Sequence, residues 1–314
     1  MDTLTESAGA HPGFWRRLGA FVIDTTILGI VGALIGFAAF DLLAGLGEWA
    51  RLLGLGLATV YFGAFGSKML GGSTPAQRLL KLRVVSLEGG QISLGRSLVR
   101  GLVLVAPMAC NGIELTLTPA NLVVVAFAGV TLFGLGLAQL YLLIFNRPTR
   151  RLAHDLLTGT VVVRSDRTAA PGTSGGTTHV RVAIGIVGGV AVIMTGLTAY
   201  TLTQLPRPLA EMMSALGAVN ALPEVQSSTI ADSSTVMITT RSGRTVSRNL
   251  VLNARLKAWP ADPKAEARKL GKALVARHPP APDQNVVVNI RYGFNMGIAS
   301  SWRSYSETFS DLTH

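Results

Sequence analysis

Asp24 is a carboxylate in an otherwise apolar stretch and follows Arg17 by seven residues. On a helix, side chains with this spacing project from nearly the same face, two turns apart. Asp24 would then lie about 10 Å deeper than Arg17 in an apolar layer, where a carboxylate costs about 2.5–3.5 kcal/mol on membrane-insertion scales. We therefore expect Asp24 to face the interior of a helical bundle and to have a partner there, or to carry a proton.

Two roles for Asp24 follow from this cost. It is either a carboxylate that binds a cation or a proton, or one half of a buried ion pair that locks the first helix to a basic cap. In both cases we predict that it faces Arg17 and the basic cap rather than lipid. The candidate arginine partners are Arg17, Arg78, Arg83 and Arg151.

His154 and Asp155 form a second polar group that invites a metal or catalytic interpretation. The sequence places no second histidine nearby and no nucleophile–base pair in the apolar part of the chain. The competing interpretation is structural, with Asp155 capping a helix or pairing with Arg16, Arg17 or Arg83. We therefore expect no metal, no cofactor and no enzymatic activity.

The composition indicates that these groups sit in a membrane protein. Hydrophobic residues make up 49% of the 314 residues, the mean hydropathy is +0.43, and only 14% of residues are charged. Soluble domains carry about 25% charged residues. A bilayer core needs about 20 mostly apolar residues per helix. The predicted spans are Leu18–Leu43, Leu52–Leu70, Leu98–Leu115, Leu122–Phe145 and Val182–Thr203.

Basic residues predict the orientation of these spans. Lys and Arg concentrate in the N-terminal segment and in the second-to-third and fourth-to-fifth connections, whereas the two opposite turns offer only Arg51. By the positive-inside rule, the basic segments and the N-terminus face the cytoplasm and the C-terminal domain lies outside. The net charge of +11 then reflects topology, and no nucleic acid partner is expected. Cys110 is the only cysteine, which excludes an intrachain disulfide.

Three motifs lie in order between the spans. They are Arg17-Leu-Gly-Ala-Phe-Val-Ile-Asp24, then Gly71-Gly-Ser-Thr-Pro-Ala-Gln-Arg78-Leu-Leu-Lys-Leu-Arg83-Val-Val, and finally Arg151-Leu-Ala-His154-Asp155-Leu-Leu-Thr-Gly159-Thr160-Val-Val. Together they resemble the RDD family of bacterial membrane proteins over about residues 13–164. That family is named for an arginine and two aspartates, which here match Arg17, Asp24 and Asp155.

The resemblance implies a multi-pass protein of the bacterial cytoplasmic (inner) membrane. The family is described as transport-related, and cation/proton exchange is proposed for some of its members. This chain departs from the family pattern at Ala76-Gln77, where members usually have Gly-Lys. Residues 181–314 lie outside the resemblance.

The expected fold is an α-helical membrane bundle, with four RDD-type spans plus a fifth span, and a small α+β extracytoplasmic C-terminal domain. Residues 1–164 form the membrane domain, 165–180 a flexible cytoplasmic linker, 181–204 the fifth transmembrane helix, and 205–314 the outer domain. In the outer domain we expect an antiparallel sheet with one amphipathic helix at Asp262–Arg277.

Two further contacts are predicted within the membrane domain. Leu82–Ser86 and Gly159–Val163 are short β-prone runs that cannot stand alone, so we predict that they pair in a small cytoplasmic sheet. Gly32-x-x-x-Gly36 and Gly185-x-x-x-Gly189 permit close helix contacts, which we expect within one chain.

Two function classes remain open at this point. One is a transporter or ion/proton exchanger with Asp24 as the coupling carboxylate. The alternative is a membrane-anchored sensor or scaffold whose outer α+β domain binds a partner or ligand. The expected partners are the lipid bilayer, a second copy of the chain as a homo-oligomer, and a periplasmic or extracellular partner for residues 205–314.

Overall fold

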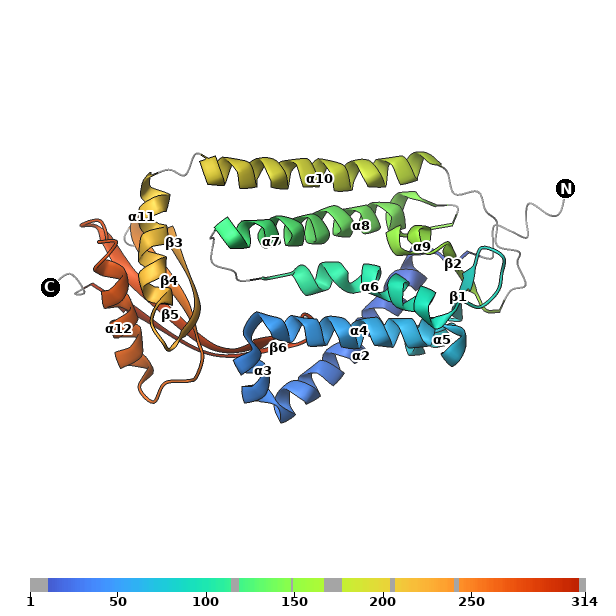
Figure 1. Cartoon of the computed structure of the whole chain (residues 1–314), viewed down its shortest axis with the longest axis horizontal. Helices are drawn as coiled ribbons and strands as arrows, with labels where there is room; N and C mark the ends of the chain where they lie inside the picture. The colour runs from blue at the N-terminus through green and yellow to red at the C-terminus, as the bar shows by residue number, and fades with distance from the viewer. Residues whose placement is uncertain are drawn as a thin grey trace.

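The membrane part of the chain is a bundle of helices that lie side by side (Figure 1). The computed structural model describes residues 11–113, 119–147, 149–166, 177–203, 207–239 and 243–310. The predicted linker therefore falls largely outside the described residues. The bundle helices are α2 (Phe14–Ala38), α3 (Phe40–Leu46), α4 (Ala50–Gly66), α6 (Leu94–Cys110), α7 (Pro119–Gly129), α8 (Gly136–Phe145) and α10 (Thr177–Thr203).

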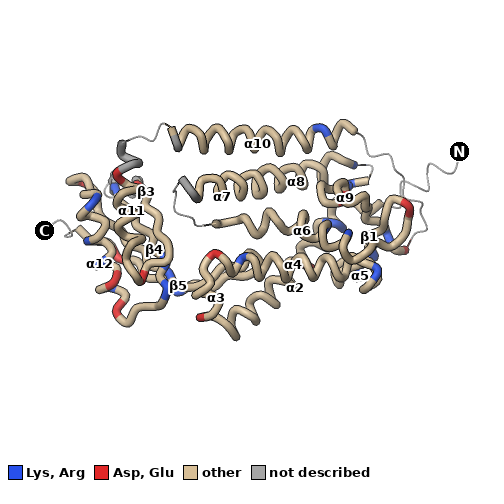
Figure 2. The backbone as a smooth tube through the Cα atoms, in the orientation of Figure 1, with Lys and Arg blue, Asp and Glu red and all other residues tan. Residues whose placement is uncertain are grey.

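Three of the described helical segments are long and apolar enough to cross a membrane. They are Phe14–Ala38, Asn121–Phe145 and Thr177–Thr201. The second combines α7 and α8 through a π-helical stretch at Val130–Leu135. Charged residues gather at the two ends of the bundle and leave its middle largely uncharged (Figure 2). This distribution matches helices that lie in hydrocarbon between two aqueous layers.

The other predicted spans differ from the observed helices in length. The predicted Leu18–Leu43 span is interrupted at Ala39, where α2 ends and the separate short helix α3 begins. Helices α4 and α6 have 17 residues each, which corresponds to about 25 Å. The first turns of α6 carry Arg96 and Arg100, so its apolar part begins only after them.

A two-stranded sheet covers one end of the bundle (Figure 1). Strands β1 (Leu82–Ser86) and β2 (Thr160–Arg164) pair antiparallel, with Val84 opposite Val162. Each strand satisfies the backbone groups of the other, which confirms the predicted pairing. The short helices α5 (Pro75–Leu79) and α9 (Ala153–Leu157) lie beside this sheet.

The C-terminal domain lies at the opposite end of the bundle (Figure 1). Its sheet has the order β3-β4-β5-β6, formed by Val225–Thr239, Gly243–Leu256, Gln284–Asn295 and Ser300–Phe309. The expected fully antiparallel sheet is wrong at one pairing, because β4 and β5 are parallel. Helix α12 (Pro263–Val275) crosses over between them and returns the chain in the same direction. A buried core joins the sheet to α12 and α11 (Arg207–Asn220).

The hairpin formed by β5 and β6 reaches from this domain into the bundle. Its tip, residues 294–298, packs in one buried cluster with Leu43 of α3 and Ala50 of α4. A Cβ at Gly36 would overlap the Phe294 ring, and a Cβ at Gly32 would lie 2.8 Å from that of Ala299. The Gly32-x-x-x-Gly36 pattern therefore allows the close approach of the β5–β6 hairpin to α2, rather than that of a second helix, which we predicted.

The second glycine pattern has no such neighbour. No described atom lies within 4 Å of the place that a Cβ would take at Gly185 or Gly189 of α10. Most of this helix is exposed in the described structure, with Ile184, Val192 and Ile193 among its outward-facing residues. In a bilayer this face would contact lipid.

Candidate functional site

The functional side chains of α2 lie on one buried stripe. Its buried residues are Arg17, Ala20, Asp24, Leu28, Gly32 and Gly36. Their spacing of three or four residues keeps them on a single helix face. Both Arg17 and Asp24 therefore point into the protein, as predicted, while Val22 is exposed.

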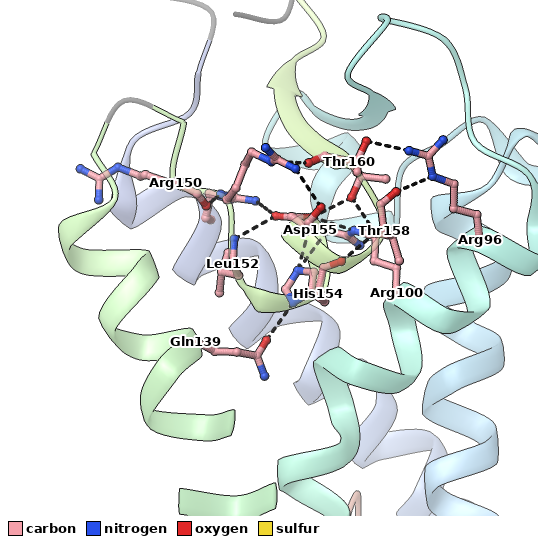
Figure 3. Close-up of polar contacts among 12 residues, drawn as sticks. Arg96, Arg100, Gln139, Arg150, Leu152, His154, Asp155, Thr158 and Thr160 are labelled. Atoms are coloured by element: carbon pink, nitrogen blue, oxygen red, sulfur yellow. Dashed lines mark hydrogen bonds and ion pairs between the residues drawn. The ribbon is translucent and has the colours of Figure 1, made fainter. Parts of the chain in front are cut away.

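Asp155 is the centre of the larger of two polar clusters (Figure 3). Its carboxylate is fully buried and accepts hydrogen bonds from Arg17 Nη2 at 2.8 Å and from Arg100 Nε at 2.9 Å. The Thr160 hydroxyl donates to it at 3.1 Å, and the Leu152 backbone N–H at 3.4 Å. Asp155 is thus a helix-capping residue and an ion-pair partner at once, which joins the two structural roles that we expected.

His154 extends this cluster into the membrane bundle. Its Nδ1 lies 2.8 Å from Gln139 Oε1, and its Nε2 lies 3.3 Å from Arg100 Nη2. An arginine can only donate, so Nε2 accepts and the proton sits on Nδ1. Gln139 is oriented for this role, since its own amide donates to the Val103 carbonyl at 3.4 Å. These two hydrogen bonds are those of a neutral imidazole, although Asp155 Oδ1 also lies 3.5 Å from Nε2.

The electrostatics of the cluster agree with this assignment. Burial lowers the pKa of His154 to about 3, with smaller contributions in both directions from Asp155 and the two arginines. Burial opposes the ionisation of Asp155, but the charges of Arg100 and Arg17 hold its pKa well below the usual range. At neutral pH, Asp155 is an anion and His154 is uncharged.

Two more arginines complete the cluster around the start of α9. Arg151 is buried and donates to two backbone carbonyls, that of Thr160 at 3.0 Å and that of Asp155 at 3.3 Å. Arg150 donates to the Leu143 carbonyl, and its own carbonyl accepts from Arg17 Nη1. These bonds fix the connection between α8 and α9 against α2.

Asp24 belongs to a separate cluster, and its predicted pairing with Arg17 is wrong. Its carboxylate accepts from the Thr74 hydroxyl at 2.5 Å, from the Tyr61 hydroxyl at 2.6 Å and from the Ala76 backbone N–H at 3.3 Å. Arg17 turns instead to Asp155, which draws it away along the same helix face. Within the described ranges, no Lys or Arg forms an ion pair with Asp24.

The second motif folds into a loop that delivers these donors to Asp24. Gly71 and Gly72 adopt the left-handed backbone that favours glycine, with φ of 83° and 74°. Thr74 then caps α5, and Pro75 occupies its first position. Gln77 closes a capping box by accepting from the Thr74 backbone N–H at 3.1 Å. The Gln77 side chain therefore supplies part of the cap, and the Ala76 backbone N–H, which any residue but proline would offer, is one donor to Asp24.

The remaining candidate arginines lie outside both clusters. Arg78 donates to the Leu70 carbonyl, and its Cζ lies over the Phe65 ring, 5.7 Å from the ring centroid. Arg83 is exposed on β1. Neither contacts Asp24 or Asp155 in the described structure.

A cavity of about 280 Å³ lies between the two clusters. Arg17 and Asp24 of α2 line it, together with Arg100, Gln139 and His154. Its other walls are mostly apolar and come from α2, α4, α6 and α8, with Leu82 and Val162 of the small sheet at one end. Polar side chains of both clusters thus border one cavity.

The site candidates predicted from the sequence do not include Arg100, Gln139 or Tyr61. Arg100 belongs by sequence to a basic connection, although it stands directly before the long apolar run and is 4% exposed. Gln139 is the one amide inside α8, which is a recognisable signal. Tyr61 carries no such signal, because a single tyrosine in an apolar helix is common.

Nowhere in the described ranges do three His, Cys, Asp or Glu side chains come together in a way that could hold a metal ion. The polar groups that line the cavity are the Asp24 carboxylate, the Gln77 and Gln139 amides, the His154 imidazole and the guanidinium groups of Arg17 and Arg100.

Comparison with known proteins assigns the membrane part of the chain. The sequence model of the RDD family matches residues 11–159. No curated protein and no solved structure matches the chain. The matched residues contain Arg17, Asp24 and Asp155, the helices of the bundle up to α9, and the first strand of the small sheet. The protein therefore carries an RDD-family membrane domain over residues 11–159, joined to a further helix and a C-terminal α+β domain.

Proposed function

We propose that the protein is a transporter or ion/proton exchanger of the bacterial inner membrane, with Asp24 as its coupling carboxylate. The observation that carries this proposal is the environment of Asp24. The side chain is 1% exposed, lies on the cavity wall, and has only neutral donors as its described partners. Ionisable groups inside membrane domains commonly mark ion and proton pathways.

The local chemistry suits reversible binding of a proton or a cation. A proton or metal cation that arrives from the cavity would cancel a charge that no described arginine cancels. The hydroxyl oxygens of Tyr61 and Thr74 adjoin the carboxylate, and hard cations prefer such oxygen ligands. Loss of the charge would also loosen the Thr74–Ala76 loop, since charged acceptors form the stronger hydrogen bonds.

The topology that goes with this proposal keeps the β1–β2 sheet and the N-terminus in the cytoplasm. It counts α4 and α6 as spans beside the three longer segments and places residues 205–314 outside. The lopsided distribution of Lys and Arg supports it. A single bundle of this size makes a thin pathway, so we include a homo-oligomer in the proposal, with no enzymatic activity.

Proton flux in proteoliposomes tests the role of Asp24. A pH-sensitive dye inside the vesicles reports flux driven by a Na⁺ or K⁺ gradient. Asp24→Asn keeps the shape of the side chain and can keep its hydrogen bonds, so it should fold and abolish flux. Asp166→Asn, at an exposed carboxylate paired with Arg164, is the matched control and should transport normally. Wild-type flux in the folded Asp24→Asn protein would overturn the proposal.

The second candidate, a sensor, is favoured by the docking of the C-terminal domain on the bundle. Arg255 of β4 pairs with Glu48 at 2.6 Å, and Glu48 also pairs with Arg51 at 2.5 Å. The Tyr292 hydroxyl donates to Asp41 at 2.8 Å. A ligand or partner that shifts the outer domain would therefore pull on α2, α3 and α4 through the hairpin.

Hydrogen exchange distinguishes this candidate from the first. Gly54→Val should displace the hairpin tip, because a side chain there overlaps the Met296 carbonyl. For a sensor, exchange at residues 150–164 on the other end of the bundle should rise as well. Unchanged exchange at those residues would show that the domain does not signal through the bundle.

A further inference from the structure

The charges buried around the cavity do not balance. Among the side chains there that are less than 10% exposed, the three arginines Arg17, Arg100 and Arg151 outnumber the two aspartates Asp24 and Asp155. His154 is neutral by its hydrogen bonds. One positive charge is therefore in excess, and buried charges are costly unless they are paired.

The contacts show which part of the site carries this excess. Asp155 is shared between Arg17 and Arg100, and its single charge offsets only one of them. The described acceptors of Arg151 are neutral backbone carbonyls. Asp24 is occupied by its own three donors. The excess thus falls on the arginine side of the cavity, where Arg17 and Arg100 form part of the wall.

The rest of the cavity is suited to an apolar body. Phe21, Phe62, Leu104, Leu140 and Leu143 contribute to its walls. Its volume of about 280 Å³ is close to the lower end of small-molecule sites, which hold about 300–1,000 Å³. That volume suits one chain of limited length and not the two chains of a complete phospholipid.

We propose that this cavity binds a single-chain anionic amphiphile. Its carboxylate or phosphate head lies against Arg17 and Arg100, and its chain follows the apolar walls toward Leu140 and Leu143. Guanidinium groups bind both kinds of head through paired hydrogen bonds. The proposal rests on the cavity and its charges, and it stands whether or not Asp24 couples ion transport.

Native mass spectrometry of the full-length protein in an uncharged maltoside detergent tests the choice of head group. The probes are decanoate, decyl phosphate, decanol and decylamine, which share one ten-carbon chain. We expect one decanoate or decyl phosphate per protein, bound at least tenfold more tightly than decanol, and no decylamine. Preference for one of the two anions identifies a carboxylate or a phosphate as the ligand. Equal binding of the alcohol, tighter binding of the amine, or no binding of either anion would overturn the proposal.

A pair of glycine substitutions tests the location. A Cβ at Gly136, on the cavity wall, would lie 3.8 Å from Pro107, so Gly136→Leu should fill the cavity without disturbing either charge cluster. Gly188→Leu adds the same side chain to the exposed part of α10. We expect Gly136→Leu to weaken anion binding at least tenfold and Gly188→Leu to leave it unchanged.

A third variant covers a failure of Gly136→Leu to fold, which size-exclusion chromatography would reveal. Leu140→Trp enlarges a side chain that is already part of the wall and half exposed, so the backbone need not move. It should also weaken anion binding. Binding that survives in a folded, cavity-filled variant would show that the anion sits elsewhere.

Discussion

Arg17 and Asp155 form a buried ion pair across 138 residues of sequence, with Nη2 and Oδ2 2.8 Å apart. The pair joins the start of α2, the first long helix, to the start of α9, which follows the bundle helix α8. Two of the three residues for which the RDD family is named therefore contact one another, while the third, Asp24, contacts a loop instead.

Removing one partner of this pair should destabilise the protein strongly. Arg17→Gln leaves Asp155 with a single arginine, and Asp155→Asn leaves two buried arginines without their carboxylate, so each should cost about 3–5 kcal/mol. The double variant should cost less than the sum of the two. Thermal unfolding in detergent measures all three, with exposed Arg83→Gln as a control within about 0.5 kcal/mol of wild type. Additive losses would contradict a direct interaction.

Stability should fall in mildly acidic solution because of His154. Its pKa drops from the usual 6.5 to about 3 in the folded protein, so between these values the unfolded chain binds a proton that the folded chain does not. The contribution of neutral His154 to the free energy of unfolding is therefore complete above pH 6.5. It is lost as the pH falls toward 3, by about 1.4 kcal/mol per pH unit. Thermal unfolding measured between pH 7.5 and 4.5 checks this dependence, because Asp155 titrates only below that pH range.

His154→Gln should flatten this dependence. A glutamine can donate to Gln139 and accept from Arg100 without titrating. His11, whose pKa is also lowered, first by burial and then by Arg17, is the matched comparison through His11→Gln. An equal acid sensitivity in His154→Gln and wild type would show that His154 is not the titrating group.

Tyr61→Phe should remove one hydrogen bond to the Asp24 carboxylate and leave the carboxylate itself in place. The variant deletes one of three donors to the carboxylate, and a hydrogen bond to a charged group contributes about 1.5–3 kcal/mol. Under the proposed function, the rate of proton flux should fall, since the Asp24 carboxylate loses one of its three donors. The control is Tyr141→Phe, which removes a hydroxyl contact to His179 outside the cavity. Identical flux rates in both variants would separate Tyr61 from coupling.

The glycines of α4 should differ sharply in their tolerance of a side chain. Gly54 faces the backbone of Met296, so Gly54→Val should undock the hairpin tip and expose residues 294–298 to hydrogen exchange. Gly56 lies two residues further along the same helix with no described atom within 4 Å of its Cβ position. Gly56→Val should leave exchange at the tip unchanged. Similar exchange in the two variants would contradict the docked hairpin.

Sequence patterns alone predicted the apolar helices, the burial of Asp24 and the pairing of β1 with β2. Hydropathy and the 3.6-residue period report which face of an element is buried, and short β-prone runs report that a partner is required. These signals lie within single elements. Leu82–Ser86 and Gly159–Val163 each require a partner strand, and the membrane domain contains few other β-prone runs that could pair with them.

Which polar groups contact one another depends on how the helices and loops pack in three dimensions. A buried Asp24 requires hydrogen-bond or ion-pair partners. Thr74, Tyr61 and a backbone N–H meet this requirement as well as an arginine would, and the sequence does not indicate which of them does so. Arg17 and Asp24 share one helix face, yet the approach of α9 draws Arg17 to Asp155. The docking of the hairpin tip against Gly36 and Gly54 also escaped prediction, because complementarity between a glycine and a distant side chain depends on close packing in three dimensions.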